Sequence, residues 1–403
     1  MRKLSIRDVD VQGKRVLARV DFNVPIDSDK AITDDTRIVA SLPTIKNIVD
    51  RGGRLVLMSH LGRPRGQRDP ELSLTPVAYR LGELLDNPLR FIDNCVGPEV
   101  DRKISSMQDG EILMLENLRF HSGEEENDAE FAAALATNAD IYVNDAFGTA
   151  HRAHASTTGV AEHISIRAAG FLMEKELDAL GDALSSPARP FVAILGGAKI
   201  DGKINLIKSL LGTVDVLLVG GGMMYTFFKA SGLEIGRSIS DDSFLQMCKE
   251  LMDRNREGTS RLLLPVDTII AKEIEDDAST REVSTADIPE DWMGVDIGPK
   301  TVDLFKSELA KAGTIFWNGP MGVFEKPNFA EGTKAIARAV SDATDRDVVT
   351  IVGGGDSVAA INLMGIADRF THISTGGGAS LAFMEGQALP GLEALCDVAE
   401  VTG

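Results

Sequence analysis

Cysteine is scarce in this chain of 403 residues. Its three cysteines, Cys95, Cys248 and Cys396, lie far apart and show no metal-ligand spacing. Such a set disfavours a disulfide framework and a zinc ribbon, and it fits a protein that works in a reducing compartment.

Long hydrophobic runs are also missing. The longest nearly uninterrupted apolar run, residues 216–228, has 13 residues and three internal glycines, whereas a membrane-spanning helix needs roughly 20 residues. The first ten residues, MRKLSIRDVD, contain no apolar stretch after the basic residues, so they do not resemble a secretory signal. We therefore expect a cytoplasmic protein without a membrane partner.

Basic residues are outnumbered by acidic ones. The chain has 42 Lys and Arg against 61 Asp and Glu, which gives a formal net charge of −19 at pH 7. This balance disfavours a nucleic-acid partner, so any anionic ligand must be held by local basic groups. Arginine is concentrated in residues 1–172, which contain 16 Arg and 5 Lys. Its planar fork suits bidentate recognition of phosphate and carboxylate.

Short apolar runs alternate with helical patterns along the whole chain. Such runs are typical of buried parallel strands, and the alternation predicts an α/β protein with two doubly wound, Rossmann-like parallel sheets. The expected strands are Arg15–Asp21, Arg54–Ser59, Ile112–Leu115, Ile141–Asn144, Phe191–Leu195, Val214–Val219, Leu262–Pro265, Thr314–Trp317, Val348–Val352 and His372–Ser374. The expected helices are Asp34–Val49, Pro76–Leu85, Glu126–Thr137, Lys203–Leu211, Asp241–Asn255, Lys300–Ala312 and Phe329–Val340.

The length of the chain predicts two domains, because one domain usually has roughly 100–200 residues. We place the boundary before Met173, which gives an N-terminal domain of residues 1–172 and a second domain of residues 173–391. The Ser- and Pro-containing segment Ser185–Pro190 precedes the first strand of the second domain and is the best candidate for a hinge.

Glycine-rich segments follow the predicted strands of the second domain. Ligands bind beyond the carboxyl ends of parallel strands, and glycine lets backbone amides approach a phosphate closely there. A set of such loops in one domain predicts a phosphorylated ligand, although each alone is explained by a tight turn. The loops are GGAK at 196–199, GGG at 220–222, NGPMG at 318–322, GGGDS at 353–357 and GGG at 376–378.

Two common nucleotide-binding motifs are incomplete. Residues 197–204 nearly match the P-loop pattern, but they end on Ile204, which has no hydroxyl for magnesium. The G-x-G-x-x-G fingerprint fails at its third glycine, where Tyr225, Val358 and Leu381 stand. A dinucleotide fold of the usual kind is therefore disfavoured. Lys199 and Lys203 are still spaced to converge on a phosphate from one helical turn.

The strand exits of the first domain carry a different chemistry. Arginine and histidine gather there, which predicts a focused basic basin for a small ligand with phosphate and carboxylate groups. The acidic run Glu124–Glu126 is expected to be the solvated start of a helix, and Met224 to be packing. The basin's candidates are Asp21, Asn23, Arg37, His60, Arg63, Arg119, His151, Arg152 and His154.

The motifs that contain these residues resemble those of the phosphoglycerate kinase family. They occur in family order across essentially the whole chain: DFNVP, TDDTRI, SHLGRP, LENLRF, VNDAFGTAHRAH, LGGAKI, WNGPMGVFE, GGGDS and STGGGAS. The resemblance implies two α/β domains joined by a hinge, with 3-phosphoglycerate on the first and Mg-ADP or Mg-ATP on the second. It also implies a monomer, and a C-terminal tail of about residues 392–403 that returns to the first domain. The implied reaction is reversible phosphoryl transfer from 1,3-bisphosphoglycerate to Mg-ADP in glycolysis.

The resemblance carries roles to individual residues. Two departures are mild: Ser357 stands where threonine is usual but keeps the hydroxyl, and Gly202 stands where a polar residue is common. The implied phosphoglycerate ligands are Asp21, Asn23, Arg37, His60, Arg63, Arg119 and Arg152. The implied nucleotide ligands are Gly196, Gly197, Lys203, Gly294, Asn318, Glu325 through the ribose, Gly354, Gly355, Asp356 through magnesium, and Ser357. The implied catalytic groups are Arg37, Lys199, Lys203 and Gly376.

These residue types suit the implied chemistry. In the kinase direction the acceptor is a carboxylate already ionised at pH 7, so the transfer needs charge neutralisation and positioning rather than a general base. Two alternatives stay open. Another nucleotide-dependent enzyme, such as a dehydrogenase, would lack its glycine fingerprint, and a non-catalytic metabolite-binding protein would not need Arg37, Lys203 and Asp356 together.

Overall fold

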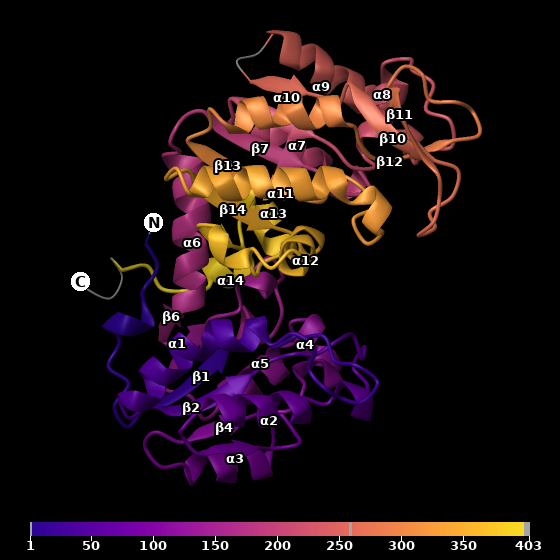
Figure 1. The fold of residues 1–403 in the computed structure, drawn as a ribbon. Helices are drawn as coiled ribbons and strands as arrows, with labels where there is room; N and C mark the ends of the chain where they lie inside the picture. The colour runs from indigo at the N-terminus through magenta and orange to yellow at the C-terminus, as the bar shows by residue number, and fades with distance from the viewer. Residues whose placement is uncertain (1, 258–259, 399–403) are drawn as a thin grey trace. The chain divides into compact units, whose positions relative to one another are not determined.

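The computed structural model describes residues 2–257 and 260–398, and the chain forms two compact units (Figure 1). The first unit runs to Asp178 and also includes the C-terminal segment that starts at Ala388, and the second unit is Ala179–Gln387. The boundary falls inside helix α6 (Phe171–Ser185), a few residues after the division that the sequence predicts. Residues 399–403 of the expected tail lie outside the described residues.

The first unit is built on a parallel six-stranded sheet with the order β3-β4-β2-β1-β5-β6. The strand order reverses between β1 and β5, which makes this place the topological switch point of the sheet. Doubly wound sheets bind ligands at the loops that follow the two strands there. The strands are β1 (Arg15–Arg19), β2 (Arg54–Met58), β3 (Leu89–Phe91), β4 (Ile112–Met114), β5 (Ile141–Asn144) and β6 (Ile166–Ala169). The helices besides α6 are α1 (Thr36–Asp50), α2 (Thr75–Leu84), α3 (Pro98–Ser105), α4 (Ser122–Glu125), α5 (Ala129–Ala136) and α14 (Pro390–Glu393).

The second unit contains another parallel six-stranded sheet, with the order β15-β14-β13-β7-β8-β9. All five residues of β7 are buried, as expected for a central strand covered on both faces. The strands are β7 (Phe191–Leu195), β8 (Val216–Val219), β9 (Arg261–Leu263), β13 (Thr314–Asn318), β14 (Val349–Gly353) and β15 (His372–Ile373). The helices are α7 (Ile204–Leu210), α8 (Met224–Ala230), α9 (Leu245–Glu257), α10 (Pro299–Leu309), α11 (Glu331–Thr344), α12 (Gly355–Leu363) and α13 (Gly378–Met384).

An antiparallel sheet of three strands also belongs to the second unit, with the order β11-β10-β12. The strands are β10 (Asp267–Ala271), β11 (Thr280–Ser284) and β12 (Met293–Ile297). The sequence does not predict this sheet, because β11 reads TREVS, is mostly exposed and has no apolar run. The edge strands β3 and β6 escape prediction for a related reason, since they are short and only partly buried. The two doubly wound sheets themselves are confirmed.

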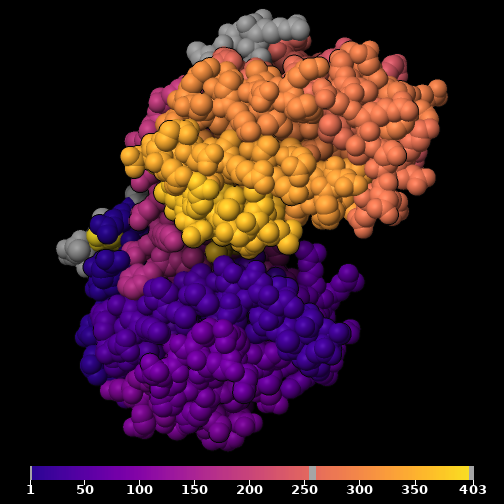
Figure 2. Space-filling model, viewed as in Figure 1, coloured from indigo at the N-terminus to yellow at the C-terminus, as the bar shows by residue number. Residues whose placement is uncertain are grey.

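The C-terminal segment pairs with other parts of the first unit. The amide of Leu4 donates to the carbonyl of Cys396 at 2.8 Å, and the amide of Cys396 donates to the carbonyl of Arg167 at 3.0 Å. In Figure 2 the colours of this unit run from indigo through purple to magenta, and the C-terminal segment has the yellow of the chain's end. Within residues 2–257 and 260–398, no helix is both long and apolar enough to cross a membrane.

Candidate functional site

The loops after β1 and β2 of the first unit are tied together around an ion pair. Asp21 follows β1 and is only 7% exposed, and Arg37 on the first turn of α1 donates from Nη1 to Asp21 Oδ2 at 3.0 Å. The same nitrogen donates to the carbonyl of Asn23 at 3.3 Å, while Asn23 Oδ1 accepts from the amide of Gly62 at 2.9 Å. Within the described residues, no hydrogen bond of Arg37 Nε or Nη2 appears, so these donors can serve an anion.

Arg119 joins the same set of loops from the exit of β4. It is 3% exposed, donates from Nη1 to the carbonyl of Gly62 at 2.8 Å and lies with Nε 3.2 Å from Glu125 Oε1. Asn117 Oδ1 accepts from the amide of Leu61 at 3.2 Å and so holds the β4 exit against the β2 exit. The structure thereby brings Asp21, Asn23, Arg37 and Arg119 to one end of one sheet, as the sequence predicts.

Two histidines, His60 and His154, lie among the arginines of the first unit, and the pKa of each is lowered. Burial lowers the pKa of His60 well below its usual range, and the positive charges of Arg19, Arg119 and Arg37 lower it further. Burial, followed by Arg119, Arg19 and Arg152, lowers the pKa of His154 to about 4. Both imidazoles are therefore neutral at pH 7, because burial disfavours their charged form and the surrounding arginines add to that effect. An anionic ligand would be attracted to this cluster.

In the second unit, Lys203 links the ends of β7 and β13, the two strands beside the topological switch point of that sheet. Its Nζ donates to the carbonyl of Gly196, which follows β7, at 2.6 Å and to the carbonyl of Asn318, the last residue of β13, at 3.1 Å. A side chain at Gly196 would place its Cβ 2.1 Å from the carbonyl oxygen of Pro320, so only glycine fits there. Burial lowers the pKa of Lys203 to about 8, although Asp356 opposes the shift.

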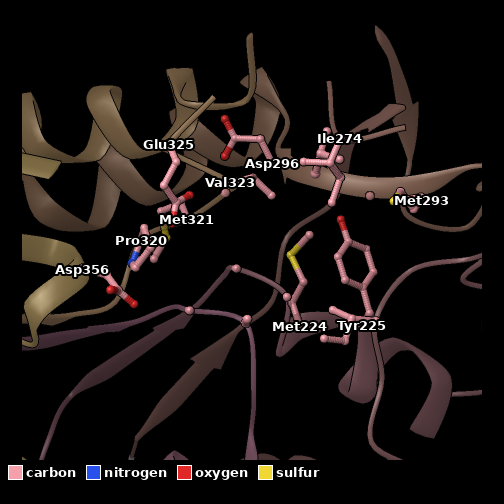
Figure 3. A pocket seen from close by; sticks show the side chains of 18 of the residues that line it. Met224, Tyr225, Ile274, Met293, Asp296, Pro320, Met321, Val323, Glu325 and Asp356 are labelled. Atoms are coloured by element: carbon pink, nitrogen blue, oxygen red, sulfur yellow. The ribbon is translucent and has the colours of Figure 1, made fainter. Parts of the chain in front are cut away.

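Four of the five glycine loops of the second unit contribute residues to the lining of a cavity of about 340 Å³ (Figure 3), a volume within the range of small-molecule sites. Of the nucleotide ligands that the sequence predicts, Gly197, Gly294, Glu325 and Asp356 line it. Figure 3 shows Glu325, Pro320 and Asp356 on one side, and Tyr225, Ile274 and Met293 on the other. The cavity thus has a side with the carboxylates of Glu325 and Asp356 and a mostly apolar side.

Helix α12 points its first turn at this region. Gly354 has a φ of 89°, a conformation that favours glycine, and Asp356 stands in the first turn. Ser357 Oγ accepts from the amide of Gly319 at 2.5 Å, which joins the helix start to the loop after β13. The free amides of a helix N-terminus and its dipole favour a bound phosphate.

A model of the phosphoglycerate kinase family matches residues 6–387. The chain belongs to the phosphoglycerate kinase family. It is 55% identical over 397 residues to the phosphoglycerate kinase of Chlorobium phaeobacteroides, covering 98% of this chain and 100% of that protein. It is 56% identical over 395 residues to that of Chlorobium luteolum, with the same coverage.

Solved structures of the phosphoglycerate kinase family share the fold. The enzyme from Coxiella burnetii superposes with a TM-score of 0.87 at 40% identity, covering 98% of this chain and 99% of that one. The enzyme from Pyrococcus horikoshii gives 0.84 at 33% identity, with 97% and 98% coverage. Membership of the phosphoglycerate kinase family places the chain among the phosphotransferases.

Three residues that the family motifs assign to the sites make fewer side-chain contacts with the other predicted site residues. Arg63 is exposed, and within the described residues no hydrogen bond or ion pair of its side chain appears. Lys199 is exposed as well, so the structure itself does not join it to Lys203, which turns back onto its own loop. Arg152 donates from Nε to His151 Nε2 at 3.1 Å. The roles of these side chains stay predictions.

The loop at Gly376 has one amide already in use. The amide of Gly376 donates to Ser374 Oγ at 3.1 Å, and Ser374 Oγ lies 2.6 Å from Ser380 Oγ. Gly377, with a φ of 51°, then leads into α13. The sequence predicts that the amides of the whole triplet, residues 376–378, approach a phosphate. Because the Gly376 amide already donates to Ser374, the amides of Gly377 and Gly378 are the candidates for that role.

Several lining residues of the cavity escape sequence reasoning. Met224 and Tyr225 start α8, and Ile274 and Met293 come from the segment around the antiparallel sheet. Met224 is buried, as expected for a packing residue, and it also lines the cavity. Gly294, which the sequence does predict to be a nucleotide ligand, lies directly against Tyr225. A Cβ at Gly294 would be 1.7 Å from Tyr225 Oη.

Glu124 contradicts the expectation of a solvated acidic run. Its side chain is fully buried, and both carboxylate oxygens accept hydrogen bonds from Ser156. The error arose because a run of three glutamates is usually exposed, and Ser156 lies 32 residues away in the sequence. Glu124 therefore belongs to the interior of the first unit, beneath its basic cluster.

Magnesium fits one carboxylate at the cavity. Within the part of the chain that the structure describes, no group of three or more His, Cys, Asp and Glu could hold a metal ion. Asp356 lines the cavity near Lys203 and offers the hard oxygen ligands that magnesium prefers. Magnesium commonly binds through one or two carboxylates together with phosphate oxygens and water, so Asp356 suits an ion that arrives with a nucleotide.

Proposed function

We propose that this chain catalyses direct, in-line and reversible phosphoryl transfer from 1,3-bisphosphoglycerate to Mg-ADP, giving 3-phosphoglycerate and ATP. The observation that carries the proposal is that each parallel sheet gathers basic side chains at the point where its strand order reverses. The first unit offers a cluster of arginines, and the second offers Lys203, glycine loops and a cavity of about 340 Å³.

The cluster of the first unit is the proposed phosphoglycerate site. Arg119 is buried and fixed by the carbonyl of Gly62, so it presents a guanidinium to an anion with little loss of conformational entropy. The Asp21–Arg37 pair orients Arg37 in the same way, and Asp21 is the natural acceptor for a substrate hydroxyl. His60, Asn23, Arg63 and Arg152 complete the proposed set.

The cavity of the second unit is the proposed nucleotide site. Its apolar side suits the base, Glu325 suits the ribose hydroxyls, and the amides at the start of α12 suit the phosphates. Asp356 would hold Mg²⁺, which neutralises phosphate charge when bound. Gly197 and Gly294 line this cavity, and Gly196 and Asn318, whose carbonyl groups accept from Lys203, complete the proposed set.

The chemistry requires no general base in the kinase direction. The attacking carboxylate is ionised at pH 7, so the protein must position the two oxygens in line and stabilise charge on the transferred group. Arg37 from the first unit and Lys203 from the second are the proposed cationic groups, with Lys199 and the amides following Gly376 as further candidates. In this proposal each unit supplies one of the cationic groups that stabilise negative charge on the transferred phosphoryl group.

Nucleotide affinity should fall as the pH rises through about 8. The pKa of Lys203 is lowered to about 8 by burial, so its ammonium group is charged below that pH and neutral above it. Because phosphate binds the charged form, the dissociation constant of Mg-ADP should increase by up to about tenfold for each pH unit above 8. Calorimetric titration between pH 7 and 9.5 measures this change.

Two lysine variants test the assignment of that pH dependence. Lys203→Met should bind Mg-ADP weakly and with a flat profile across the same range. Lys208→Met, which removes an exposed lysine from α7, should keep the wild-type slope. An equal slope in wild type and Lys203→Met would exclude Lys203 as the titrating group.

Closure about a hinge is the proposed way in which the two substrates meet. The connection runs through α6 and the segment Ser185–Pro190, and a closed site excludes water that would otherwise hydrolyse the acyl phosphate. Small-angle scattering should show a smaller radius of gyration with 3-phosphoglycerate and Mg-ATP together than with either alone. An unchanged radius with both substrates bound would refute closure.

The protein is proposed to act as a cytoplasmic monomer, as the family resemblance implies. Turnover tests the activity: purified protein supplied with 3-phosphoglycerate and Mg-ATP should form 1,3-bisphosphoglycerate. Added glyceraldehyde-3-phosphate dehydrogenase and NADH make that product visible. Elution volume with in-line light scattering tests the oligomeric state, and a dimeric mass would refute the monomer.

A further inference from the structure

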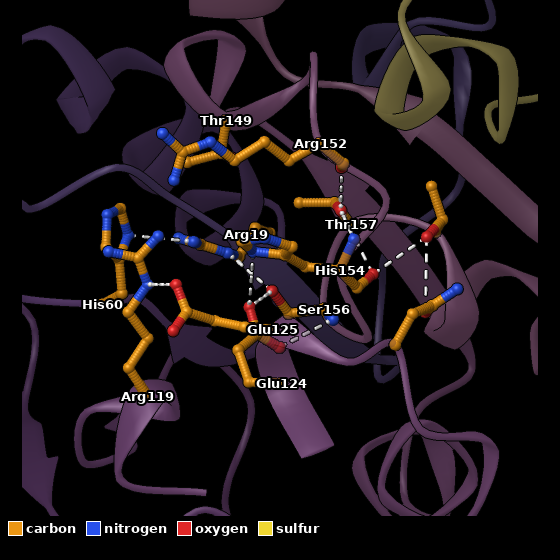
Figure 4. A network of polar contacts seen from close by, with 12 residues as sticks. Arg19, His60, Arg119, Glu124, Glu125, Thr149, Arg152, His154, Ser156 and Thr157 are labelled. Carbon is orange, nitrogen blue, oxygen red and sulfur yellow. Dashed lines mark hydrogen bonds and ion pairs between the residues drawn. The ribbon is translucent and has the colours of Figure 1, made fainter. Parts of the chain in front are cut away.

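A network of buried polar side chains in the first unit links Glu124, Ser156, Arg19 and His60 (Figure 4). Arg19, at the end of β1, is 1% exposed. Its Nε donates to Ser156 Oγ at 2.8 Å, its Nη1 donates to the carbonyl of Val20, and its Nη2 lies 3.0 Å from His60 Nδ1. All three nitrogens of the guanidinium thus have partners, which fixes the orientation of the side chain.

Glu124 lies on the side of this network away from His60, where its Oε1 is also 3.8 Å from His154 Nδ1. Ser156 Oγ donates to Glu124 Oε1 at 2.6 Å, and the amide of Ser156 donates to Oε2 at 3.0 Å. Because the hydroxyl proton of Ser156 is directed to a carboxylate, its lone pairs face Arg19 Nε as acceptors. Glu124 also supplies the negative charge that a buried arginine requires. A fully buried carboxylate cannot itself contact a ligand that arrives from solvent.

His60 lies on the other side of the network. An arginine side chain can only donate, so the 3.0 Å contact makes His60 Nδ1 an acceptor. The nearest carboxylate oxygen to that atom, Asp21 Oδ1, lies 3.9 Å away, beyond hydrogen-bond distance. A neutral imidazole with Nδ1 as acceptor carries its proton on Nε2. Within the described residues, no hydrogen bond of His60 Nε2 appears, so this N–H remains a donor for a ligand.

We propose that Glu124 and Ser156 are positioning residues of the phosphoglycerate site: they orient Arg19, which in turn holds His60 as the tautomer protonated on Nε2. His60 then donates to an oxygen of the anionic substrate without changing its protonation state. The alternative tautomer would present a lone pair to that oxygen and repel it. This inference rests on the proposed function, because it takes His60 as a ligand of phosphoglycerate.

Nuclear magnetic resonance tests the tautomer directly. Long-range ¹H–¹⁵N correlation spectra of histidine-labelled protein distinguish the two neutral forms, and the His60→Gln variant assigns the His60 signals. Ligand-free wild-type protein should show His60 protonated on Nε2. Ser156→Ala removes the acceptor of Arg19 Nε, so His60 should shift toward a mixture of tautomers. Glu124→Gln should shift it in the same direction, because the amide leaves one acceptor for Ser156 where the carboxylate has two, and the countercharge is lost.

Steady-state kinetics test the consequence for the substrate. In Ser156→Ala the KM for 3-phosphoglycerate should rise about tenfold, the cost of a weakened hydrogen bond to a charged ligand, while the KM for Mg-ATP stays unchanged. Ser5→Ala is the matched control, since Ser5 is a buried serine of the same unit whose hydroxyl accepts from the amide of Arg7. This variant should change neither the His60 spectrum nor either KM.

The outcomes separate the positioning network from the proposed function. A wild-type spectrum with the proton on Nδ1 overturns the inference, whether or not any variant folds. An unchanged tautomer in folded Ser156→Ala and Glu124→Gln also overturns it. A changed tautomer with an unchanged KM for 3-phosphoglycerate would show that His60 does not bind this substrate, which overturns the positioning role. Loss of turnover in wild type, with the expected spectrum retained, would instead refute the proposed function.

Discussion

Replacing Arg37 with alanine should lower turnover by about 10³–10⁵-fold, the range found for a single arginine that stabilises a transferring phosphoryl group. Arg37 is the half-buried cation held by Asp21 Oδ2 at 3.0 Å and by the carbonyl of Asn23 at 3.3 Å. Its removal also leaves the Asp21 carboxylate uncompensated beside an anionic substrate, which adds repulsion to the lost attraction. Steady-state kinetics with both substrates saturating measure the loss.

The control for Arg37→Ala is Arg68→Ala in the same unit. Arg68 is an exposed arginine that pairs with Asp93 at 3.3 Å, and its removal should leave turnover unchanged because an exposed pair contributes little. Calorimetry should show that Arg37→Ala binds Mg-ADP as the wild type does. Equal damage to turnover and to nucleotide binding would contradict a role at the transferring phosphoryl group.

Replacing Asp356 with asparagine should lower turnover by about 10²-fold or more, because a metal ion supplies several kcal/mol of charge stabilisation in the transition state. The change keeps the size of the side chain and removes only its charge. Asp356 lies in the first turn of α12, lines the cavity and is the carboxylate whose charge opposes the pKa shift of Lys203. Calorimetry with and without Mg²⁺ should show that magnesium no longer strengthens nucleotide binding.

Asp303→Asn is the matched control for the second unit, since Asp303 is exposed on α10. It should keep wild-type turnover and the wild-type response to magnesium. If Asp356→Asn retained the full magnesium dependence of nucleotide binding, another group would have to hold the metal, and the assignment of Asp356 would be wrong.

The sequence predicts the parallel sheets because their central strands are continuous apolar runs. A strand such as β7, FVAIL, is buried along its whole length, and the glycine and charge that follow it mark a ligand-binding end. The positions of Asp21, Arg37 and Lys203 follow from this rule alone, since each stands just after a strand or in the helix that the strand enters. The family motifs then add which ligand each end should bind.

Contacts between distant segments explain what the sequence does not show. Glu124 is buried where Ser156, far along the chain, donates to both of its oxygens. The antiparallel sheet is missed because β11 carries charge at positions where a pattern would need apolar residues, and with it the apolar wall of the cavity at Ile274 and Met293 is missed. Such features depend on tertiary partners rather than on local propensity.

Turnover in a coupled assay tests the central claim most directly, namely that the arginine cluster of the first unit and the cavity of the second bind the two substrates of one phosphoryl transfer. Purified protein with 3-phosphoglycerate, Mg-ATP, NADH and glyceraldehyde-3-phosphate dehydrogenase should oxidise NADH at a rate that saturates separately in each substrate. Omission of either substrate should abolish the rate. A sample that is folded by circular dichroism but yields no NADH oxidation would contradict the account.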